Sequence, residues 1–464
     1  MVSNGYPPND VGGVEVYTAS LAKGLVVAGH QVTVFARASS PSIADYTRTD
    51  VDIDSVRVLR IVNDHKNSSS FHETFADATI ERMFESVLSD LSPDVVHFNH
   101  LISLSARLPA LAKQHHVPSV VTLHDHWPIC HRITMLDWQN RLCGGPKNGG
   151  VCHTCVMAGA KHAWLPTRIG GFLKANTPLN LRLRLRQMLP EGMDRLPTME
   201  VTEEIFEQRY ALFKKSLLQA GRLLVPSNYL RTQYAINGYP EVGFEIVPLG
   251  IELDIPQTPI APSLSRITFA AIGSIMPAKG IDILVKAFMQ VDADHIRLDI
   301  YGQTPTAHQG YVKKLKRLAQ ADQRIHFKRP FDPQHRGRIF ENVDVLVVPS
   351  RMPETFSLVA REALLYGKPV IGSRNGALPE IIVDGENGFL FSPERTDQLE
   401  AIIDRIARNP SLLSELTCPG PIPIITLREH IAMIEKIYRQ VLADASQADE
   451  HIRVSDPSTH EIAP

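Results

Sequence analysis

The sequence predicts an α/β protein with two parallel-sheet domains. Short apolar runs alternate with segments whose apolar residues recur at helical spacing, an order typical of βαβ units. The 464 residues provide for two to three domains of ordinary size. Residues 252–265 (ELDIPQTPIAPSLS) are rich in Pro and Ser and lack periodicity, so we expect the domain boundary there.

Composition excludes several classes of protein. The 48 basic and 50 acidic residues nearly balance, which gives no electrostatic support for nucleic-acid binding. No apolar run approaches the ~20 residues that cross a bilayer, and the N-terminus lacks the basic and apolar regions of a secretory signal. We therefore expect a cytoplasmic protein. Peripheral binding to the inner face of a membrane is the alternative.

The chain opens on a short strand. Only residues 1–3 precede a Pro/Gly loop, which suggests a truncated or misassigned start. Helical spacing covers residues 14–25, and a strand follows over 31–35. Gly12 and Gly13 open the helix at a place where backbone can approach a phosphate or sugar closely, although a plain turn is the simpler explanation of a Gly-Gly pair.

Further strands are predicted over residues 94–97 and 118–123, with a helix over 101–113 between them. The second of these strands ends in His124-Asp125-His126-Trp127. Ligands bind at the carboxyl ends of parallel strands, so His124 is a candidate site residue. A structural histidine is the alternative, because the chain contains 19 histidines.

Four of the five cysteines follow in the pattern C-x12-C-x8-C-x2-C: Cys130, Cys143, Cys152 and Cys155. Four such thiols could close a tetrahedral zinc site or hold an iron–sulfur cluster. Disulfides are disfavoured in a reducing cytosol. The alternative is four unliganded thiols in a glycine-rich loop. Any metal would be structural and would hold this loop beside His124.

Residues 156–221 are less regular and partly helical. Arg182, Arg184 and Arg186 alternate with apolar residues there. A solvated basic helix face is the common explanation, and contact with anionic head groups around a lipid-linked acceptor is the alternative. Strands over 223–226 and 244–248 complete the first domain.

The second domain opens with a strand over residues 267–272, which leads through Gly273 and Ser274 to Lys279 and Gly280. A lysine beside free N–H groups at a helix start suits a phosphate. An ordinary exposed lysine would be unfavourable with the helix dipole there. Strands are also predicted over 297–301, 325–327 and 344–348.

Residues 349–391 are the most informative stretch. Glu354 lies in a loop before a helix, and Glu362 follows more than two turns later, which offers two carboxylates at a strand-to-helix crevice. Thr355, Phe356 and Ser357 supply free backbone N–H groups at the helix start. Two surface glutamates near a helix start are the alternative.

The same stretch resembles the signature of the family-4 retaining glycosyltransferases: PS, a Glu shortly after, E-x7-E, G-x-PV-I, G-x-x-P-E and DG-x-NG-x-L. The resemblance implies that Glu354 contacts the donor sugar and that Glu362 binds the nucleotide ribose. It implies that Lys279 grips the diphosphate, where Ser274 replaces the usual arginine. It also places His124 near the reacting sugar carbon.

Further residues take donor-side roles by the same resemblance. Their backbone lines the nucleotide or the cleft between donor and acceptor. They are Gly12, Gly13, Gly273, Gly280, Phe331, Thr355, Phe356, Ser357 and Leu358.

The resemblance implies the GT-B fold, with two Rossmann-like domains whose parallel sheets face an interdomain cleft. We expect residues 1–252 as the acceptor-side domain, with inserts over 130–155 and 156–221, and 253–425 as the nucleotide-sugar domain. We expect 426–444 as a helix crossing back to the first domain and 445–464 as a disordered tail.

The function implied is a retaining hexosyltransferase-type glycosyltransferase that moves a sugar from a nucleotide-diphosphate sugar to a hydroxyl acceptor, in cell-surface polysaccharide or glycoconjugate synthesis. The acceptor is a sugar, a glycan or a lipid-linked molecule, and catalysis requires no cofactor. A nucleotide-sugar 2-epimerase and a degenerate nucleotide-sugar-binding protein are the alternatives. A dehydrogenase is disfavoured because no G-x-G-x-x-G follows a strand.

Overall fold

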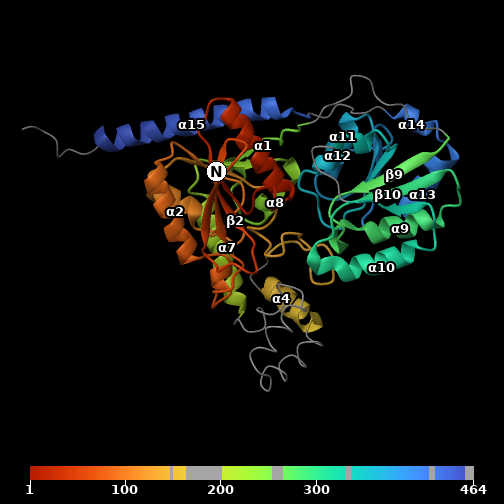
Figure 1. The fold of residues 1–464 in the computed structure, drawn as a ribbon, viewed down its shortest axis with the longest axis horizontal. Coiled ribbons are helices and arrows are strands. Elements are labelled where there is room, and N and C mark those ends of the chain that lie inside the picture. Colours follow the sequence, from red (N-terminus) through yellow and green to blue (C-terminus); the bar gives the residue numbers. More distant parts are fainter. Residues whose placement is uncertain (147–149, 164–200, 253–264, 330–335, 417–423, 455–464) are drawn as a thin grey trace, which may run out of the picture.

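The computed structural model describes the chain except for residues 147–149, 164–200, 253–264, 330–335, 417–423 and 455–464. Two sheets, each covered by helices, lie beside one another (Figure 1). One is built before the boundary predicted over 252–265 and the other after it. The GT-B expectation of two Rossmann-like domains with parallel sheets is therefore confirmed in its α/β architecture.

The first sheet has the strand order β3-β4-β2-β1-β5-β6-β7-β8 among the described residues, and only the β3–β4 pairing is antiparallel. β1 is short and central, between β2 and β5. Its strands are β1 (Val2–Ser3), β2 (Thr33–Ala38), β3 (Arg48–Ile53), β4 (Val56–Val62), β5 (Val96–Phe98), β6 (Ser119–Thr122), β7 (Arg222–Val225) and β8 (Phe244–Ile246).

Helices pack on both faces of this sheet, which explains why its central strands are apolar on both sides. The helical elements of this domain are α1 (Gly13–Val27), the 3-10 turn η1 (His72–Thr74), α2 (Ala78–Leu91), α3 (Leu108–Gln114), α4 (Gly150–Ala163), α7 (Glu203–Leu217), α8 (Asn228–Ile236) and the 3-10 turn η3 (Glu241–Gly243). Of these, α4 packs against α7 and lies away from the sheet (Figure 1). The helix predicted over 101–113 begins only at Leu108, because Ser103 adopts a left-handed backbone (φ 53°) that interrupts it.

The second sheet is parallel throughout its described strands, in the order β11-β10-β9-β12-β13-β14. They are β9 (Ile267–Ile272), β10 (Ile296–Tyr301), β11 (Ile325–Phe327), β12 (Val345–Val348), β13 (Val370–Ser373) and β14 (Gly388–Phe391). The helical elements are η4 (Pro277–Lys279), α9 (Ile281–Gln290), η5 (Thr306–His308), α10 (Gln309–Ala319), α11 (Arg336–Phe340), α12 (Leu358–Leu365), η7 (Leu378–Glu380), α13 (Thr396–Arg408) and α14 (Leu412–Glu415).

The last helix, α15 (Leu427–Val454), follows the second sheet in sequence but lies along the first domain, against α1 (Figure 1). The tail was expected to be disordered from residue 445, whereas α15 continues through Val454, since nothing between Leu442 and Val454 is a Gly or Pro that would end it. At its start, Ile251 bridges to Thr426, so the two chain crossings between the domains lie side by side.

Within the described ranges, no helix is both long enough and apolar enough to cross a bilayer.

Candidate active site

Two loops of the second domain lie together at the carboxyl edge of its sheet. One follows β9 and carries Lys279, and the other follows the neighbouring strand β12 and carries Glu354. The backbone N–H groups of Arg351 and Met352 both donate to the carbonyl of Ala278, at 2.9 and 3.0 Å. Adjacent strands of a parallel sheet thus deliver the two sequence-predicted residues to one place.

Gly280 makes this approach possible. Its φ of +67° is left-handed, and a Cβ added there would lie 1.9 Å from the Pro349 carbonyl oxygen. Gly376 plays the same part on the other side of Glu354, because its Cβ would lie 2.3 Å from the Glu354 carbonyl oxygen. Only glycine combines the backbone conformation with the missing side chain at these positions.

Lys279 and Glu354 form an ion pair. Lys279 Nζ lies 2.8 Å from Glu354 Oε1, and the Ser350 hydroxyl donates to the same oxygen. The Glu354 side chain is 10 % exposed and that of Lys279 29 % exposed. Glu354 therefore holds the Lys279 ammonium in place at the edge of solvent. A cation held in this way can bind an anionic ligand.

The other predicted donor residues are spread over the same two loops. Gly273 and Ser274 are exposed after β9, and Glu362 is buried on α12. Ser357 is the left-handed residue (φ 56°) that precedes α12, and Leu358 begins the helix. Phe331 lies outside the described residues.

Phe356 differs from its neighbours because its side chain is part of a hydrophobic core. It is buried in a cluster that includes Tyr17 of α1 and Ile434 of α15. The guanidinium of Arg361 lies 3.6 Å from the centroid of its ring. The loop that carries Glu354 is therefore anchored in apolar packing shared with the first domain.

Thr355 joins the two domains. Its hydroxyl donates to the carbonyl oxygen of His124 at 2.7 Å, and its own carbonyl accepts from the Ser227 hydroxyl at 2.6 Å. Nearby, the Glu380 carboxylate accepts from the first two backbone N–H groups of α8, at 3.2 and 2.5 Å. The predicted residues Glu354 and His124 are thus brought together, with Thr355 between them.

His124 itself is buried, and its ring meets the edge of the Tyr17 ring at 4.7 Å between centroids. Burial lowers the pKa of His124 to about 3, so the ring is neutral at physiological pH. Its Nε2 has no hydrogen-bond partner among the described residues. A neutral imidazole with an open nitrogen can make one hydrogen bond to a ligand.

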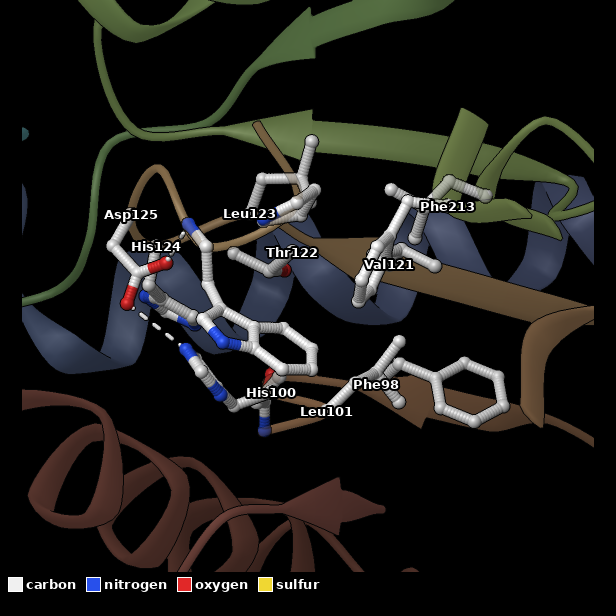
Figure 2. A pocket seen from close by; sticks show the side chains of 13 residues that line it. Phe98, His100, Leu101, Val121, Thr122, Leu123, His124, Asp125 and Phe213 are labelled. Carbon is white, nitrogen blue, oxygen red and sulfur yellow. Dashed lines mark hydrogen bonds and ion pairs between the residues drawn. The ribbon is translucent and has the colours of Figure 1, made fainter. Parts of the chain in front are cut away.

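Asp125 is fixed by its neighbours (Figure 2). Its carboxylate accepts from Trp127 N–H at 2.8 Å and lies 2.9 Å from His100 Nε2. His100 Nδ1 accepts from the Ile102 N–H, so the proton lies on Nε2. Burial opposes ionisation of Asp125, but its interaction with His100 and the hydrogen bond from the Trp127 N–H hold its pKa below the usual value.

A small pocket lies beside these residues at the carboxyl ends of β5 and β6 (Figure 2). Its cavity volume of about 20 Å³ accommodates a water molecule and not a sugar ring. Its lining includes Phe98, His100, Thr122, His124, Asp125 and Trp127.

Gly12 and Gly13 are exposed at the start of α1. A Cβ on Gly12 would lie 2.3 Å from Glu15 Oε2, whereas Gly13 has open space around it. Among the described contacts, none joins either glycine to Lys279 or Glu354.

Residues of α15 that the sequence did not suggest support the His124 side. His430 Nε2 lies 2.8 Å from the Tyr17 hydroxyl, and Tyr438 OH lies 2.7 Å from His97 Nδ1. A histidine and a tyrosine on a long helix give no sequence signal for such contacts, because the partners are 413 and 341 residues away.

All four clustered cysteines are free thiols. Cys130 and Cys155 are buried, whereas Cys143 and Cys152 are half-buried. Within the described ranges, no three His, Cys, Asp or Glu side chains already stand in a metal-binding arrangement. Arg182, Arg184 and Arg186, expected on the acceptor side, lie outside those ranges.

Family models match a large part of each of the two domains. Residues 266–409 match the family model described as glycosyl transferases group 1, and residues 11–147 match that of glycosyltransferase family 4. The chain belongs to the GT-B glycosyltransferases of these families. The resemblance seen in the sequence is thereby confirmed.

Relatives of this glycosyltransferase include the lipopolysaccharide 1,2-N-acetylglucosaminetransferase of Salmonella typhimurium, 29% identical over 40% of this chain and 52% of that protein. The D-inositol 3-phosphate glycosyltransferase of Corynebacterium diphtheriae is 25% identical over 85% of this chain and 82% of that protein. The match thus spans about half the length of the first relative and most of the second.

Solved structures share the fold. Sucrose-phosphate synthase from Thermosynechococcus elongatus superposes with a TM-score of 0.59 at 18% identity, over 98% of this chain and 99% of that one. HepE from Anabaena, in complex with UDP and glucose, does so with a TM-score of 0.57 at 15% identity, over 98% and 99%. The GT-B fold is therefore shown.

Proposed function

We propose that this glycosyltransferase is a retaining enzyme that transfers a sugar from a nucleotide-diphosphate sugar to a hydroxyl acceptor. The observation that supports the proposal is the Lys279–Glu354 pair at the sheet edge, joined through Thr355 to His124 of the other domain. The neighbour solved with UDP and glucose supports the choice of donor class. The relative named as a lipopolysaccharide transferase supports a role in cell-surface glycan synthesis.

Lys279 takes the leaving diphosphate. A preorganised cation near the position where negative charge develops lowers the barrier without reorganisation of solvent. When the diphosphate binds, Lys279 shares its charge between the phosphate oxygens and Glu354. Since Ser274 stands where an arginine is usual in the family, Lys279 is the main charged group that we assign to this task.

Glu354 and Glu362 position the donor. Glu354 is held by Lys279 and Ser350, so its second carboxylate oxygen can accept from a sugar hydroxyl. Glu362 is buried on α12 and accepts from the ribose. Neither is assigned proton transfer, because in this proposal both accept hydrogen bonds from hydroxyl groups of the donor.

His124 orients the reacting sugar from the first domain. With a pKa of about 3 it carries no charge at physiological pH, so it acts as a neutral hydrogen-bonding group and not as an acid. We assign no enzyme nucleophile. The acceptor hydroxyl attacks the anomeric carbon on the face that the diphosphate leaves, and its proton passes to a leaving phosphate oxygen.

Binding of nucleotide sugars, measured by calorimetry after a thermal-shift screen, tests the proposal. We expect Lys279→Met to weaken binding of the best donor by about 10- to 100-fold, as loss of a charge-assisted hydrogen bond implies. The matched control is Lys286→Met on α9, whose side chain is 58% exposed and 3.9 Å from Asp282. Equal binding by both variants would show that the diphosphate lies elsewhere.

Glu354→Gln separates donor binding from transfer. The amide oxygen still accepts from Ser350, so we expect binding to change by less than about threefold while transfer to an acceptor falls by at least about tenfold, since charge-assisted hydrogen bonds are roughly twice as strong as neutral ones. Retention is read from the anomeric configuration of the product by NMR. An inverted product would contradict the proposed mechanism.

A further inference from the structure

The sequence motif G-x-x-P-E, residues 376–380, ends in a glutamate to which the proposed reaction gives no task. Glu380 is the last residue of the turn η7 in the second domain, yet its carboxylate contacts the first domain. One oxygen accepts from the Asn228 N–H at 3.2 Å, and the other accepts from the Tyr229 N–H at 2.5 Å. Glu380 therefore binds the start of α8, a helix of the other domain.

The start of α8 requires such a partner. The first backbone N–H groups of a helix have no carbonyl within the helix to which they can donate. The Ser227 hydroxyl accepts from one of them, that of Leu230, at 3.2 Å. The first turn of α8 contains no acidic residue that could complement the positive end of the helix dipole. The Glu380 carboxylate supplies both the negative charge and the acceptors for Asn228 and Tyr229.

α8 is in turn bonded to the segment that carries His124. The Tyr234 hydroxyl donates to the Asp125 carbonyl oxygen at 2.9 Å, and the Tyr229 hydroxyl lies 3.2 Å from His126 Nε2. The two residues that follow His124 in the chain are therefore held by α8. A displacement of α8 would displace the His124 segment with it.

In its own domain, Glu380 is connected to the loop that carries Glu354. The Ala377 N–H, directly before η7, donates to the Glu354 carbonyl oxygen at 2.7 Å. Gly376 lies so close to the same loop that an added Cβ would be 2.4 Å from the Glu354 nitrogen. η7 and the Glu354 loop thus move as one unit, and Glu380 links this unit to the His124 segment through α8.

We propose that the Glu380 carboxylate is an interdomain cap, which binds the start of α8 and thereby positions His124 against Glu354 for transfer. Glu380 is a positioning residue, because it acts through α8. Its two hydrogen bonds add to the interdomain contacts of Thr355 with His124 and Ser227. The capping contact does not depend on the proposed function, whereas its effect on the transfer rate rests on that function.

The exposure of Glu380 makes the interdomain cap reversible. Glu380 is exposed to solvent, and an exposed charge at a helix start shifts an equilibrium by about two- to fivefold. A contact of that strength favours the arrangement in which the domains are joined. It also breaks readily when the domains must part to release product.

Hydrogen exchange of the full chain tests the capping contact without any assay of transfer. Among the described contacts, the amides of Asn228 and Tyr229 donate only to Glu380, so their exchange rates report on this contact. We expect Glu380→Ala to accelerate the exchange of both amides by at least about twofold. The amides that donate within α8 should keep their rates.

The matched control is Glu386→Ala, which removes another exposed carboxylate six residues along the chain. It should leave the exchange of Asn228 and Tyr229 unchanged. Equal exchange of these two amides in the native chain and in Glu380→Ala would overturn the interdomain cap. Accelerated exchange along the whole of α8 would also overturn it, because Glu380 would then stabilise the helix as such.

Steady-state kinetics and calorimetry test the positioning role. We expect Glu380→Ala to lower kcat by about two- to fivefold, with unchanged donor affinity and one donor site per chain, which shows that the variant is folded. Glu380→Gln keeps one acceptor oxygen and should lie between Glu380→Ala and the native chain. An unchanged kcat in Glu380→Ala would overturn the positioning role. A native chain that binds no nucleotide sugar would instead refute the proposed function, while hydrogen exchange would still decide on the cap.

Discussion

The two sides of the candidate active site are built in different ways. On the donor side, Lys279 and Glu354 sit on loops that follow neighbouring strands of one sheet, so the pair forms within a single domain. On the other side, His124 packs on Tyr17, which in turn bonds to His430 on a helix that follows the second domain. The donor side is therefore a local property of its sheet, and the His124 side depends on the crossing helix.

Gly280→Ala should produce the largest effect, on the donor side. A left-handed alanine costs about 1–2 kcal/mol, and crowding against the Pro349 carbonyl adds about 1–3 kcal/mol. We expect the free energy of unfolding to fall by about 3 kcal/mol and donor binding to be lost. Denaturant unfolding and calorimetry measure the two. The control is Gly310→Ala on α10, which meets nothing within 4 Å and should not destabilise.

Acid should affect the first domain before the second. Burial lowers the pKa of His124 and His131 to about 3 and that of His126 and His430 to about 4. Below about pH 6.5, the ordinary pKa of histidine, the unfolded chain therefore binds more protons than the folded chain. The stability that is present above this pH is lost as the pH falls toward about 4. At about pH 4.5 each such histidine lowers the free energy of unfolding by roughly 2–3 kcal/mol.

Two measurements follow this difference between domains. The chain has three tryptophans, Trp127, Trp138 and Trp164, all before the second sheet, so their fluorescence reports on the first domain. Hydrogen exchange reports on both domains. In the second domain His308 and His326 are only half-buried, so it should stay protected at the pH at which fluorescence changes. Simultaneous loss of both domains would contradict the prediction.

Tyr17→Phe should have a moderate effect. It removes the hydrogen bond to His430 and leaves a buried ring nitrogen without its partner, which costs about 1–2 kcal/mol of unfolding free energy. The phenyl ring still packs on His124, so the transfer rate should change by less than about threefold. A change of that size is small, because about 1.4 kcal/mol in the activation free energy changes a rate tenfold. A large fall in rate with unchanged stability would instead give the Tyr17 hydroxyl a role in the reaction.

His30→Ala should have the smallest effect and serves as the matched control for Tyr17→Phe. His30 also bonds to α15, through Glu435 at 2.9 Å, but its side chain is 48% exposed. Exposed pairs of this kind contribute less than about 1 kcal/mol. Chemical denaturation should show a change of that size or less, and a change equal to that of Tyr17→Phe would mean that burial is not what distinguishes the two contacts.

The sequence predicted closely the strands and loops that carry Lys279 and Glu354, because the signals for these elements are local. β9 and β11 have the predicted bounds, and the strand-to-helix spacing that places Glu354 and Lys279 is set by short loops. It did not predict the β3–β4 hairpin, whose turn uses Asp54 and Ser55 at positive φ in place of the usual glycine.

The His124 side was predictable only in part. The strand end at His124 follows from apolar patterning, but its support by Tyr17 and His430 does not, because no local rule links residues so far apart. The same holds for Thr355, whose position in the loop gives no indication that it bonds to another domain. Tertiary contacts of this kind depend on how the two sheets dock.

The side-by-side crossings at Ile251 and Thr426 have a mechanical consequence. Ile251 N–H donates to the Ile425 carbonyl, and Leu427 N–H donates to that of Ile251, each at 3.1 Å. Two strands of chain tied at one point behave as a single pivot and not as two independent tethers. Separation of the two domains would have to break the interdomain hydrogen bonds of Thr355 with His124 and Ser227.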